Sequence, residues 1–313
     1  MNIRTQVEYL FNARREQKKD QIELKRIELK NKYPDYKQAE DDIKKYFENS
    51  AFNGSYDTNI MNELVEELET IKKKYKIEEQ LREEYDCKLC NDTGYVDGKL
   101  CRCLKRELID AYFKLGDNSG IIVDNRFENF NENLFSNNGA NSPRDAIIKI
   151  KSLANKFVQD FENNKGESLF FYGKSGTGKT FMSGAIANAI KDKGYSVLYL
   201  TAIELVEFYR DRQFYSEDKK DYMDEKADLI KNCDLLVIDD LGVEQSNNLN
   251  SGYLYDVINY RVSFNKPFII NSNLGMSELS KRYADRIFSR IVGVSTNVEF
   301  IGGNIRLAAK KWY

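Results

Sequence analysis

Hydrophobic residues recur at helical spacing through the first quarter of the chain. Between residues 60 and 75 they follow one another by three or four positions, which places their side chains on one face of a helix. A second stretch, from about Val7 to Lys30, has the same pattern. Pro34 and the Asn-Gly pair at residues 53–54 interrupt these runs, since both favour helix ends and turns. The pattern predicts two or three amphipathic helices within residues 1–86, which either pack on their own core or dock on a partner protein.

From about Phe127 onward, short apolar runs alternate with helix-patterned segments. Such alternation, with strands that are apolar on both faces, is typical of a parallel sheet covered by helices. We therefore expect three parts: a helical region at 1–86, a cysteine-bearing module with a linker helix at 87–125, and an α/β domain at 126–313. The linker helix is predicted from about Leu104 to Leu115. The runs predicted as strands are Ser168–Tyr172, Val197–Thr201, Leu235–Asp239, Phe268–Asn271 and Val298–Ile301.

Composition and charge narrow the classes of function. The 313 residues include 48 Lys and Arg against 50 Asp and Glu, so the net charge of −2 excludes a polycation that coats nucleic acid, although not a local basic surface. The chain has no histidine, which excludes Ser-His-Asp and Cys-His catalysis and metal sites that use imidazole. It shows neither a signal-peptide pattern nor an apolar run of about 18 residues, so we expect a cytoplasmic protein that does not associate with membranes.

A glycine-rich loop directly follows the first predicted strand of the α/β domain. Residues 173–180 read Gly-Lys-Ser-Gly-Thr-Gly-Lys-Thr and open a helix-patterned stretch, which is the setting of a phosphate-binding loop. The glycines allow tight turns that aim backbone N–H groups at phosphate oxygens, and the helix adds its positive N-terminal end. Lys179 is expected to reach the β- and γ-phosphates, and Thr180 to offer its hydroxyl to Mg²⁺. The residues predicted to contact ATP are Gly173, Ser175, Gly176, Thr177, Gly178, Lys179, Thr180 and Phe181.

Two carboxylates follow the strand predicted at residues 235–239. An acid at the end of a strand beside the phosphate loop is placed to hold the Mg²⁺ ion, and Asp239 is predicted for that role. Asp240 is predicted to orient or deprotonate the attacking water. Asn273, which follows the next strand, is expected to hydrogen-bond the γ-phosphate or that water.

Arginines complete the set of candidate residues. Arg286 and Arg290 lie four residues apart on one predicted helix face, where they either stay solvated or reach the nucleotide of a neighbouring subunit. Arg306, after the last predicted strand, is expected to contact the phosphates of its own chain.

Four of the five cysteines lie close together with the spacing C-x₂-C-x₁₀-C-x-C. Two close pairs joined by a glycine-containing loop bring four thiolates around one tetrahedral Zn²⁺. An iron–sulfur cluster is the alternative, whereas a redox disulfide leaves the second pair unexplained. Cys233 is predicted to be a small core residue. The predicted zinc ligands are Cys87, Cys90, Cys101 and Cys103.

Together these motifs resemble the AAA+ ATPases, and among them the bacterial replicative helicase loaders of the DnaC/DnaI family. The resemblance implies an AAA+ P-loop core with a five-stranded parallel sheet, and no helical lid, since the chain ends soon after Arg306. It is carried by the phosphate loop together with Phe127-Glu-Asn-Phe130, Asp239-Asp240-Leu-Gly, Ser272-Asn273-Leu, Asp285-Arg286-Ile-Phe-Ser-Arg290-Ile and Gly302-Gly-Asn-Ile-Arg306.

The resemblance also implies a role for each candidate residue. Asp240 stands where most AAA+ enzymes have Glu, which favours slow, switch-like hydrolysis that a partner regulates. By the resemblance, Walker A includes Lys179 and Thr180, Walker B is Asp239 and Asp240, sensor 1 is Asn273, the arginine finger is Arg290 or alternatively Arg286, and sensor 2 is Arg306.

In loaders and initiators, helices inserted after the second strand line a channel for single-stranded DNA. The corresponding segment, Glu204 to Tyr215 with Lys219, Lys220 and Tyr222, combines aromatic rings that stack on bases with cations that meet phosphates. The alternative is that its apolar residues belong to the core; these are Leu205, Phe208, Tyr209 and Phe214.

The predicted function is that of an ATP-dependent helicase loader of the primosome. Its helical region and zinc module would grip a DnaB-type hexameric helicase, and its ATPase domain would self-associate and engage single-stranded DNA, with ATP as a switch. Two alternatives stay open. One is an IstB-like ATPase that assists a transposase. The helical, cysteine-bearing N-terminal third argues against it, because such helpers usually have a different and smaller N-terminal region. The other is an adaptor that binds nucleotide without hydrolysing it.

Overall fold

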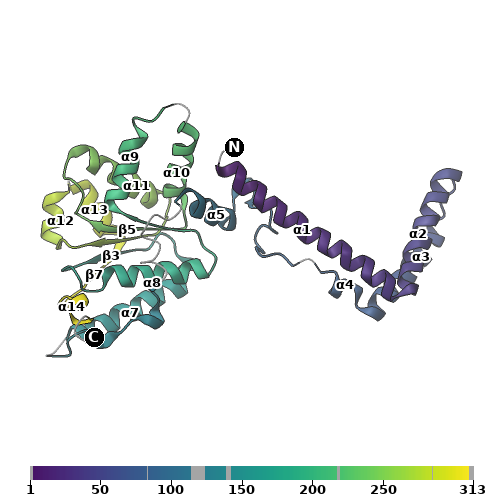
Figure 1. Cartoon of the computed structure of the whole chain (residues 1–313), viewed down its shortest axis with the longest axis horizontal. Coiled ribbons are helices and arrows are strands. Elements are labelled where there is room, and N and C mark those ends of the chain that lie inside the picture. Colours follow the sequence, from purple (N-terminus) through teal and green to yellow (C-terminus); the bar gives the residue numbers. More distant parts are fainter. Residues whose placement is uncertain are drawn as a thin grey trace. The chain divides into compact units, whose positions relative to one another are not determined.

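The computed structural model describes residues 3–82, 84–113, 124–138, 142–216, 219–283 and 285–309. Its contacts divide the chain into two compact units, Glu8–Val96 and Asp97–Tyr313 with Met1–Val7. Figure 1 labels many of the elements of both. The end predicted for the linker helix, at Leu115, lies outside the described residues.

Helices account for most of the first unit. They are α1 (Ile3–Lys32), which begins just before this unit, α2 (Pro34–Asn53), α3 (Thr58–Tyr75) and α4 (Ile77–Gln80). Pro34 occupies the start of α2, where the N–H that it lacks has no partner in a helix anyway. Gly54 ends α2 with a φ of 65°, a left-handed conformation that suits glycine. The predicted helix breaks at these two positions are confirmed.

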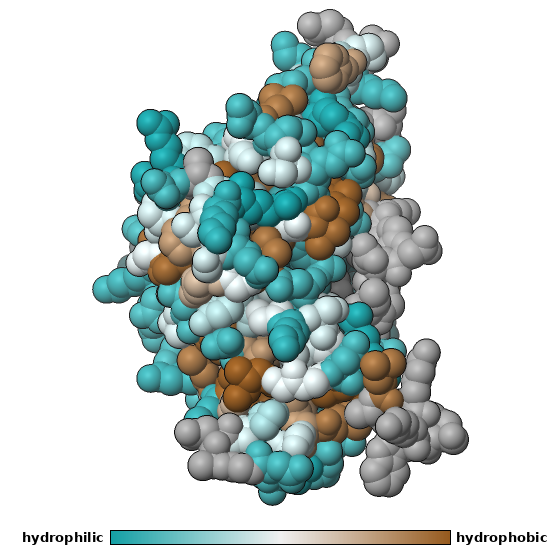
Figure 2. All heavy atoms as spheres, turned by 90° about the vertical axis from the view of Figure 1, so that its left-hand side faces the viewer, coloured by the Kyte–Doolittle hydropathy of each residue, from teal (hydrophilic) through white to brown (hydrophobic). Residues whose placement is uncertain are grey.

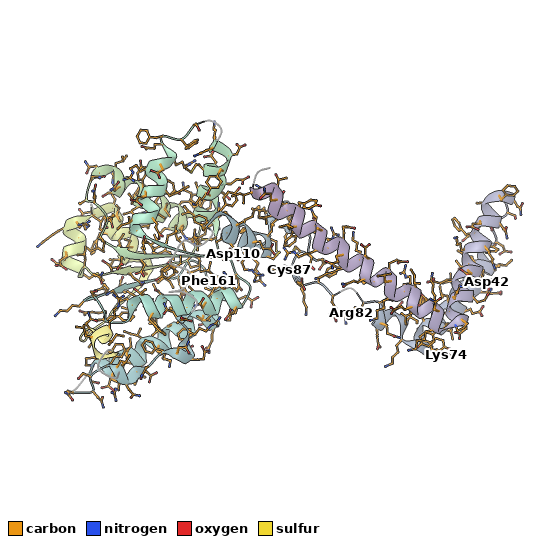
Figure 3. All side chains as sticks on the ribbon, in the orientation of Figure 1. Asp42, Lys74, Arg82, Cys87, Asp110 and Phe161 are labelled. Atoms are coloured by element: carbon orange, nitrogen blue, oxygen red, sulfur yellow. The ribbon has the colours of Figure 1, made fainter. Side chains whose placement is uncertain are left out.

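A small apolar core joins these helices. Leu29, Tyr36 and Ile77 are buried, and the rings of Tyr33 and Tyr75 stack with their centroids 4.0 Å apart. The predicted stripe of α3 is half-buried from Leu64 onward, and α3 has no fully buried residue. Many charged side chains project from α2 and α3 (Figure 3).

A hairpin and a short helix follow. β1 (Tyr95–Val96) pairs with β2 (Lys99–Leu100) through an Asp97-Gly98 turn, in which both residues have positive φ. Asp-Gly is the preferred pair for such a two-residue turn. Helix α5 (Arg102–Tyr112) then begins two residues earlier than predicted.

The second unit is built on a five-stranded sheet. Its strands are β3 (Ser168–Tyr172), β4 (Val197–Thr201), β5 (Leu235–Leu241), β6 (Phe268–Ser272) and β7 (Ser295–Glu299), in the spatial order β4-β5-β6-β3-β7. All neighbouring strands run parallel. The predicted parallel sheet is confirmed. The fifth strand begins at Ser295 rather than Val298, because it is a half-exposed, polar edge strand.

Helices cover both faces of this sheet (Figure 1). On one face lie α7 (Pro143–Gln159) and α8 (Lys179–Asp192), and on the other α9 (Ala202–Arg212), α11 (Asn248–Ser263) and α13 (Asp285–Val294). The remaining elements are η1 (Phe127–Asn129), η2 (Glu132–Leu134), η3 (Asp160–Asn163), α10 (Lys220–Asn232), α12 (Met276–Arg282) and α14 (Ile305–Ala309).

The face of this unit that carries α12 and α13 is mostly hydrophilic, with hydrophobic side chains in small groups (Figure 2). Among the described helices, none combines the length and the apolar character needed to cross a bilayer. Because parallel strands end at the same edge of a sheet, the loops after β3, β5 and β6 converge there.

Candidate functional site

The glycine-rich loop joins β3 to α8. Gly173, Gly176 and Gly178 all have positive φ, at 134°, 78° and 98°. A Cβ on Gly173 would lie 2.3 Å from the carbonyl oxygen of Phe300, and one on Gly176 would lie 2.2 Å from Asn304 Oδ1. Glycine is therefore required at both positions by backbone conformation and by space.

Lys179, the first residue of α8, folds back over this loop. Its Nζ donates to the carbonyl oxygens of Gly173 at 2.7 Å and Lys174 at 2.8 Å, and the residue is only 5% exposed. Burial lowers the pKa of Lys179 to about 8; the charges of Asp239 and Asp240 oppose the shift, and that of Arg306 adds to it. The ammonium group thus lies at the loop that would receive phosphates.

This pKa predicts how nucleotide binding depends on pH. Above pH 8 free Lys179 loses its proton, whereas bound phosphates would favour the charged form, so binding must take up a proton. We expect affinity for a fluorescent ADP analogue to fall about tenfold between pH 7 and pH 9. The arginine of the Lys179→Arg variant keeps its charge over that range, so the variant's affinity for the analogue should be the same at pH 7 and at pH 9. A wild-type affinity that is equal at both pH values would contradict this prediction.

Asp239 and Asp240 lie within β5, but their surroundings differ. Asp239 is 4% exposed; its Oδ1 accepts from Asn271 Nδ2 at 2.9 Å and its Oδ2 from the Tyr199 hydroxyl at 2.6 Å. Asp240 has a φ of 54° and accepts from Asn273 Nδ2 at 3.0 Å. Burial raises the pKa of Asp240, as does the negative charge of Asp239, while the Asn273 hydrogen bond opposes the shift.

The glycine-rich loop and the residues at the ends of β5 and β6 line a cavity of about 590 Å³. This volume is within the range of small-molecule sites. The structure brings together here most of the residues predicted for the ATP site. The cavity is lined by Ser175, Gly176, Gly178, Lys179, Thr180, Phe181, Asp240, Asn273 and Arg306, with Asn125 and Ile305 in addition.

Asn125 and Ile305 were missed by sequence reasoning. The Asn125 side chain donates to the Thr180 carbonyl at 3.4 Å, and a Cβ on Gly184 would lie 2.6 Å from its Nδ2. Ile305 donates its backbone N–H to the Gly176 carbonyl at 2.9 Å, which brings the adjacent Arg306 to the cavity. Ile305 lies within the Gly-Gly-Asn-Ile-Arg motif, which could have identified it as a site residue. Asn125 belongs to no sequence motif that could have identified it.

Arg286 and Arg290 do not line this cavity. Both lie on α13, whose Ile287 and Ile291 are buried; Arg286 is exposed and Arg290 is half-buried. Neither arginine therefore contributes to the cavity of its own chain.

The four clustered cysteines are brought together. The sulfur atoms of Cys87, Cys90, Cys101 and Cys103 all lie within 4.8 Å of one another, and Cys90 and Cys101 are buried. The backbone N–H of Gly94 donates to Cys90 Sγ at 3.3 Å. Four thiol donors at this separation match the donor set of a structural zinc site.

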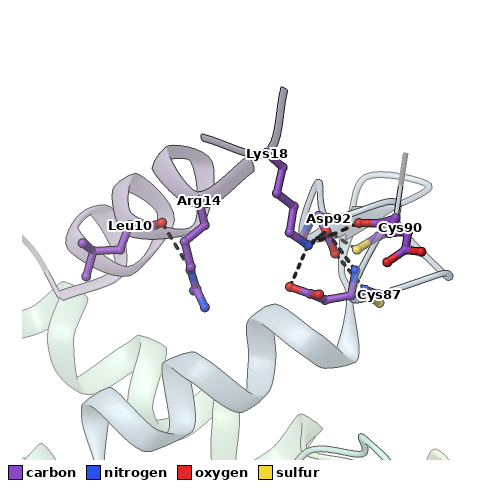
Figure 4. Close-up of polar contacts among 9 residues, drawn as sticks. Leu10, Arg14, Lys18, Cys87, Cys90 and Asp92 are labelled. Carbon is purple, nitrogen blue, oxygen red and sulfur yellow. Dashed lines mark hydrogen bonds and ion pairs between the residues drawn. The ribbon is translucent and has the colours of Figure 1, made fainter. Parts of the chain in front are cut away.

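A buried carboxylate organises the first cysteine pair (Figure 4). Asp92 accepts from the backbone N–H groups of Asp86 at 3.0 Å and Cys87 at 2.7 Å, and Lys18 Nζ lies 2.9 Å from its Oδ2. Lys18 also pairs with Asp86 at 2.8 Å. The pKa of Asp92 is lowered because these donors outweigh its burial.

The segment predicted to contact DNA is divided between core and surface. Leu205 and Tyr209 are buried, and the Tyr222 ring packs on Tyr112 with 5.2 Å between centroids. Phe214 is 81% exposed, and Lys219 and Lys220 are exposed. The core alternative therefore holds for Leu205 and Tyr209 but not for Phe214. The predicted core position of Cys233, 0% exposed, is confirmed.

Comparison with known proteins gives related sequences. The family described as IstB-like ATP binding protein matches residues 130–311. The chain is similar to the replicative helicase loader DnaI of Bacillus subtilis (strain 168), with 30% identity over 158 residues that cover 46% of this chain and 49% of DnaI. The replicative helicase loader DnaC of Escherichia coli (strain K12) is 29% identical over 140 residues, 45% of this chain and 56% of DnaC. The chain spans about half the length of these curated relatives.

Solved structures of replication proteins are also similar to this chain. A crystal structure of DnaI has a TM-score of 0.47 and 28% identity, covering 57% of this chain and 92% of that chain. AMPPCP-bound DnaA from Aquifex aeolicus has a TM-score of 0.46 and 21% identity, covering 60% and 54%. The predicted resemblance to the DnaC/DnaI helicase loaders is confirmed by the sequence relatives.

Proposed function

Because the chain belongs to the IstB-like ATP binding protein family, we propose that it is an ATP-dependent loader of a replicative DNA helicase. It binds a DnaB-type hexamer and delivers it to single-stranded DNA, with ATP binding and hydrolysis as a switch. The observation that carries the proposal is the cavity in which Lys179 and Thr180 meet Asp240, Asn273 and Arg306. Similarity to DnaI and DnaC favours a helicase as the partner over the transposase that the IstB alternative requires.

The polar residues predicted for the ATP site have separate roles in this proposal. Lys179 and Arg306 contact the phosphates, and the Thr180 hydroxyl and the Asp239 carboxylate hold Mg²⁺, which neutralises phosphate charge when bound. Asp240 receives the proton of the attacking water, and Asn273 orients Asp240 through the 3.0 Å hydrogen bond between them. The shorter side chain of Asp, compared with Glu, supports slow hydrolysis that a partner regulates.

The arginines of α13 support a shared site. Arg290, or alternatively Arg286, reaches the nucleotide of a neighbouring subunit as the ATPase domains self-associate. Their position away from the cavity of their own chain supports this role.

The cysteine cluster is proposed to hold Zn²⁺. The four thiols match the donor set, and the hydrogen bond from Gly94 to Cys90 Sγ supplies the outer contact that orients a thiolate ligand. Zinc there would stabilise the hairpin locally, as structural zinc does in small modules.

The tip of the α2–α3 hairpin is the proposed docking surface for the helicase. Four large hydrophobic residues are exposed there: Phe47 at 60%, Phe52 at 92%, Tyr56 at 56% and Ile60 at 45%. Burying such side chains against a partner releases water from apolar surface, which is the main favourable term in most protein association.

Replacing Phe52 with alanine tests this surface. We expect affinity for the helicase to fall at least about tenfold, since buried aromatic anchors carry much of the energy of an interface. Affinity is measured by titrating the protein against immobilised hexamer. Phe264→Ala removes an aromatic ring that is 61% exposed just after the end of α11, in the ATPase unit, and should leave the affinity unchanged. Equal affinities for wild type and Phe52→Ala would refute the docking surface.

Single-stranded DNA is proposed to contact the exposed part of the α9–α10 connection. Phe214 offers a ring for base stacking, and Lys219 and Lys220 offer charge to phosphates.

A further inference from the structure

We infer that Tyr199 is a positioning residue of the ATP site: its hydroxyl holds the Asp239 carboxylate in place relative to Thr180 and thereby sets the affinity for Mg²⁺. The inference rests on the proposed function, because it requires Thr180 and Asp239 to be the Mg²⁺ ligands. Tyr199 lies on β4, outside every motif of the phosphate site.

The first observation is the convergence of donors on Asp239. The Tyr199 hydroxyl donates to Oδ2 at 2.6 Å, while Asn271 Nδ2 at 2.9 Å and the backbone N–H of Asp240 at 2.8 Å donate to Oδ1. Asp239 is only 4% exposed and Asn271 is fully buried. The carboxylate is therefore held on both oxygens, and among the described residues Tyr199 is the donor to Oδ2.

Strand register explains how these side chains meet. Thr201 of β4 is paired with Asp239 of β5, so Tyr199, two residues earlier, points to the same face of the sheet as Asp239. Asn271 follows Ile270, the partner of Ile238 on β5, and so shares that face too. Helix α8 covers this face and brings Ser183 to the group.

Ser183 connects the group to the phosphate loop. Its Oγ lies 3.1 Å from the Tyr199 hydroxyl and 3.2 Å from the Thr180 carbonyl, and it accepts from Asn271 Nδ2 at 2.7 Å. The single Tyr199 proton goes to Asp239, since an ionised carboxylate only accepts. The Ser183 proton is then left for Tyr199 or for Thr180. A continuous polar path thus runs from the Asp239 carboxylate to the backbone carbonyl of Thr180, the residue whose hydroxyl is the other proposed Mg²⁺ ligand.

The orientation of the Asp239 carboxylate matters for metal binding. Mg²⁺ demands near-ideal octahedral geometry at short ligand distances, so a carboxylate that is free to rotate binds it less well. Fixing Asp239 therefore raises the affinity for Mg²⁺ and does not act on nucleotide binding directly.

The test is Tyr199→Phe, which removes one oxygen atom and keeps the ring. Affinity for a fluorescent ADP analogue is measured in EDTA and then across a Mg²⁺ titration. In EDTA the variant should bind the analogue with the affinity of wild type. The Mg²⁺ concentration that gives half of the effect should rise about tenfold, because a hydrogen bond to a charged group is lost. Tyr253→Phe on α11 is the matched control, because its buried hydroxyl has no hydrogen-bond partner among the described residues.

Three outcomes overturn the inference. One is an unchanged Mg²⁺ midpoint in Tyr199→Phe, and another is an equal loss of affinity with and without Mg²⁺, which would mean a merely structural role. If wild type itself shows no effect of Mg²⁺, the proposed ATP site fails, and the inference fails with it. Should Tyr199→Phe not fold, Ser183→Ala replaces it; this variant keeps the bond to Asp239 but cuts the path to Thr180, and its midpoint should rise about fivefold.

Discussion

Asp240→Asn is expected to lower ATP turnover by at least about a hundredfold, the lower end of what a positioned general base contributes. Nucleotide binding should persist or tighten, because the change removes a negative charge from a cavity that holds phosphates. The amide oxygen still accepts from Asn273, so local geometry is kept. Turnover is followed by phosphate release, and binding by titration of a fluorescent analogue.

Asp192→Asn is the matched control for this experiment. The Asp192 side chain is 57% exposed and pairs with Arg126 away from the cavity, so its turnover should equal that of wild type. If wild type binds nucleotide but turns over no faster than Asp240→Asn with every partner added, the non-hydrolysing adaptor is the better account.

Cys90→Ser is expected to have the largest effect on the N-terminal region. Zinc content, measured by mass spectrometry of the metal, should fall from one ion per chain to none, because a buried thiolate ligand is lost. Structural zinc contributes on the order of 10 kcal/mol in small modules, so the hairpin should also lose protection from hydrogen exchange.

Cys233→Ala separates the metal from general cysteine chemistry. Cys233 is fully buried and belongs to no cysteine cluster in the part of the chain that is described, so its zinc content should stay at one ion per chain. Zinc retained in full by Cys90→Ser would contradict the four-cysteine site, and iron in its place would favour the cluster alternative.

The buried strands of the sheet could be predicted from the sequence. β3, β4, β5 and β6 begin at the predicted residues because each is built around a run of buried or half-buried apolar residues. β7 was misplaced by three residues at its start. Its Ser-Thr-Asn-Val-Glu sequence is polar, and it becomes a strand only by pairing with β3 at the edge of the sheet.

Residues of the candidate site could be predicted from the sequence where they belong to a motif in one continuous stretch of chain. The phosphate loop and the Asp239-Asp240 pair were predicted in this way. Tyr199 and Asn271 were not, because a tyrosine or asparagine within an apolar strand looks like core until the strand register aligns it with Asp239. The role proposed for Arg286 and Arg290 depends on packing between chains, which no single sequence contains.

Helicase binding is the central claim, and native mass spectrometry tests it most directly. The full-length protein is mixed with the replicative hexameric helicase of its own host, with ATP and Mg²⁺ and again without nucleotide. We predict a stable complex of helicase and loader in the presence of ATP. Free hexamer and free protein under every nucleotide condition would contradict the account, and a complex with a transposase on duplex DNA would then support the IstB-like alternative.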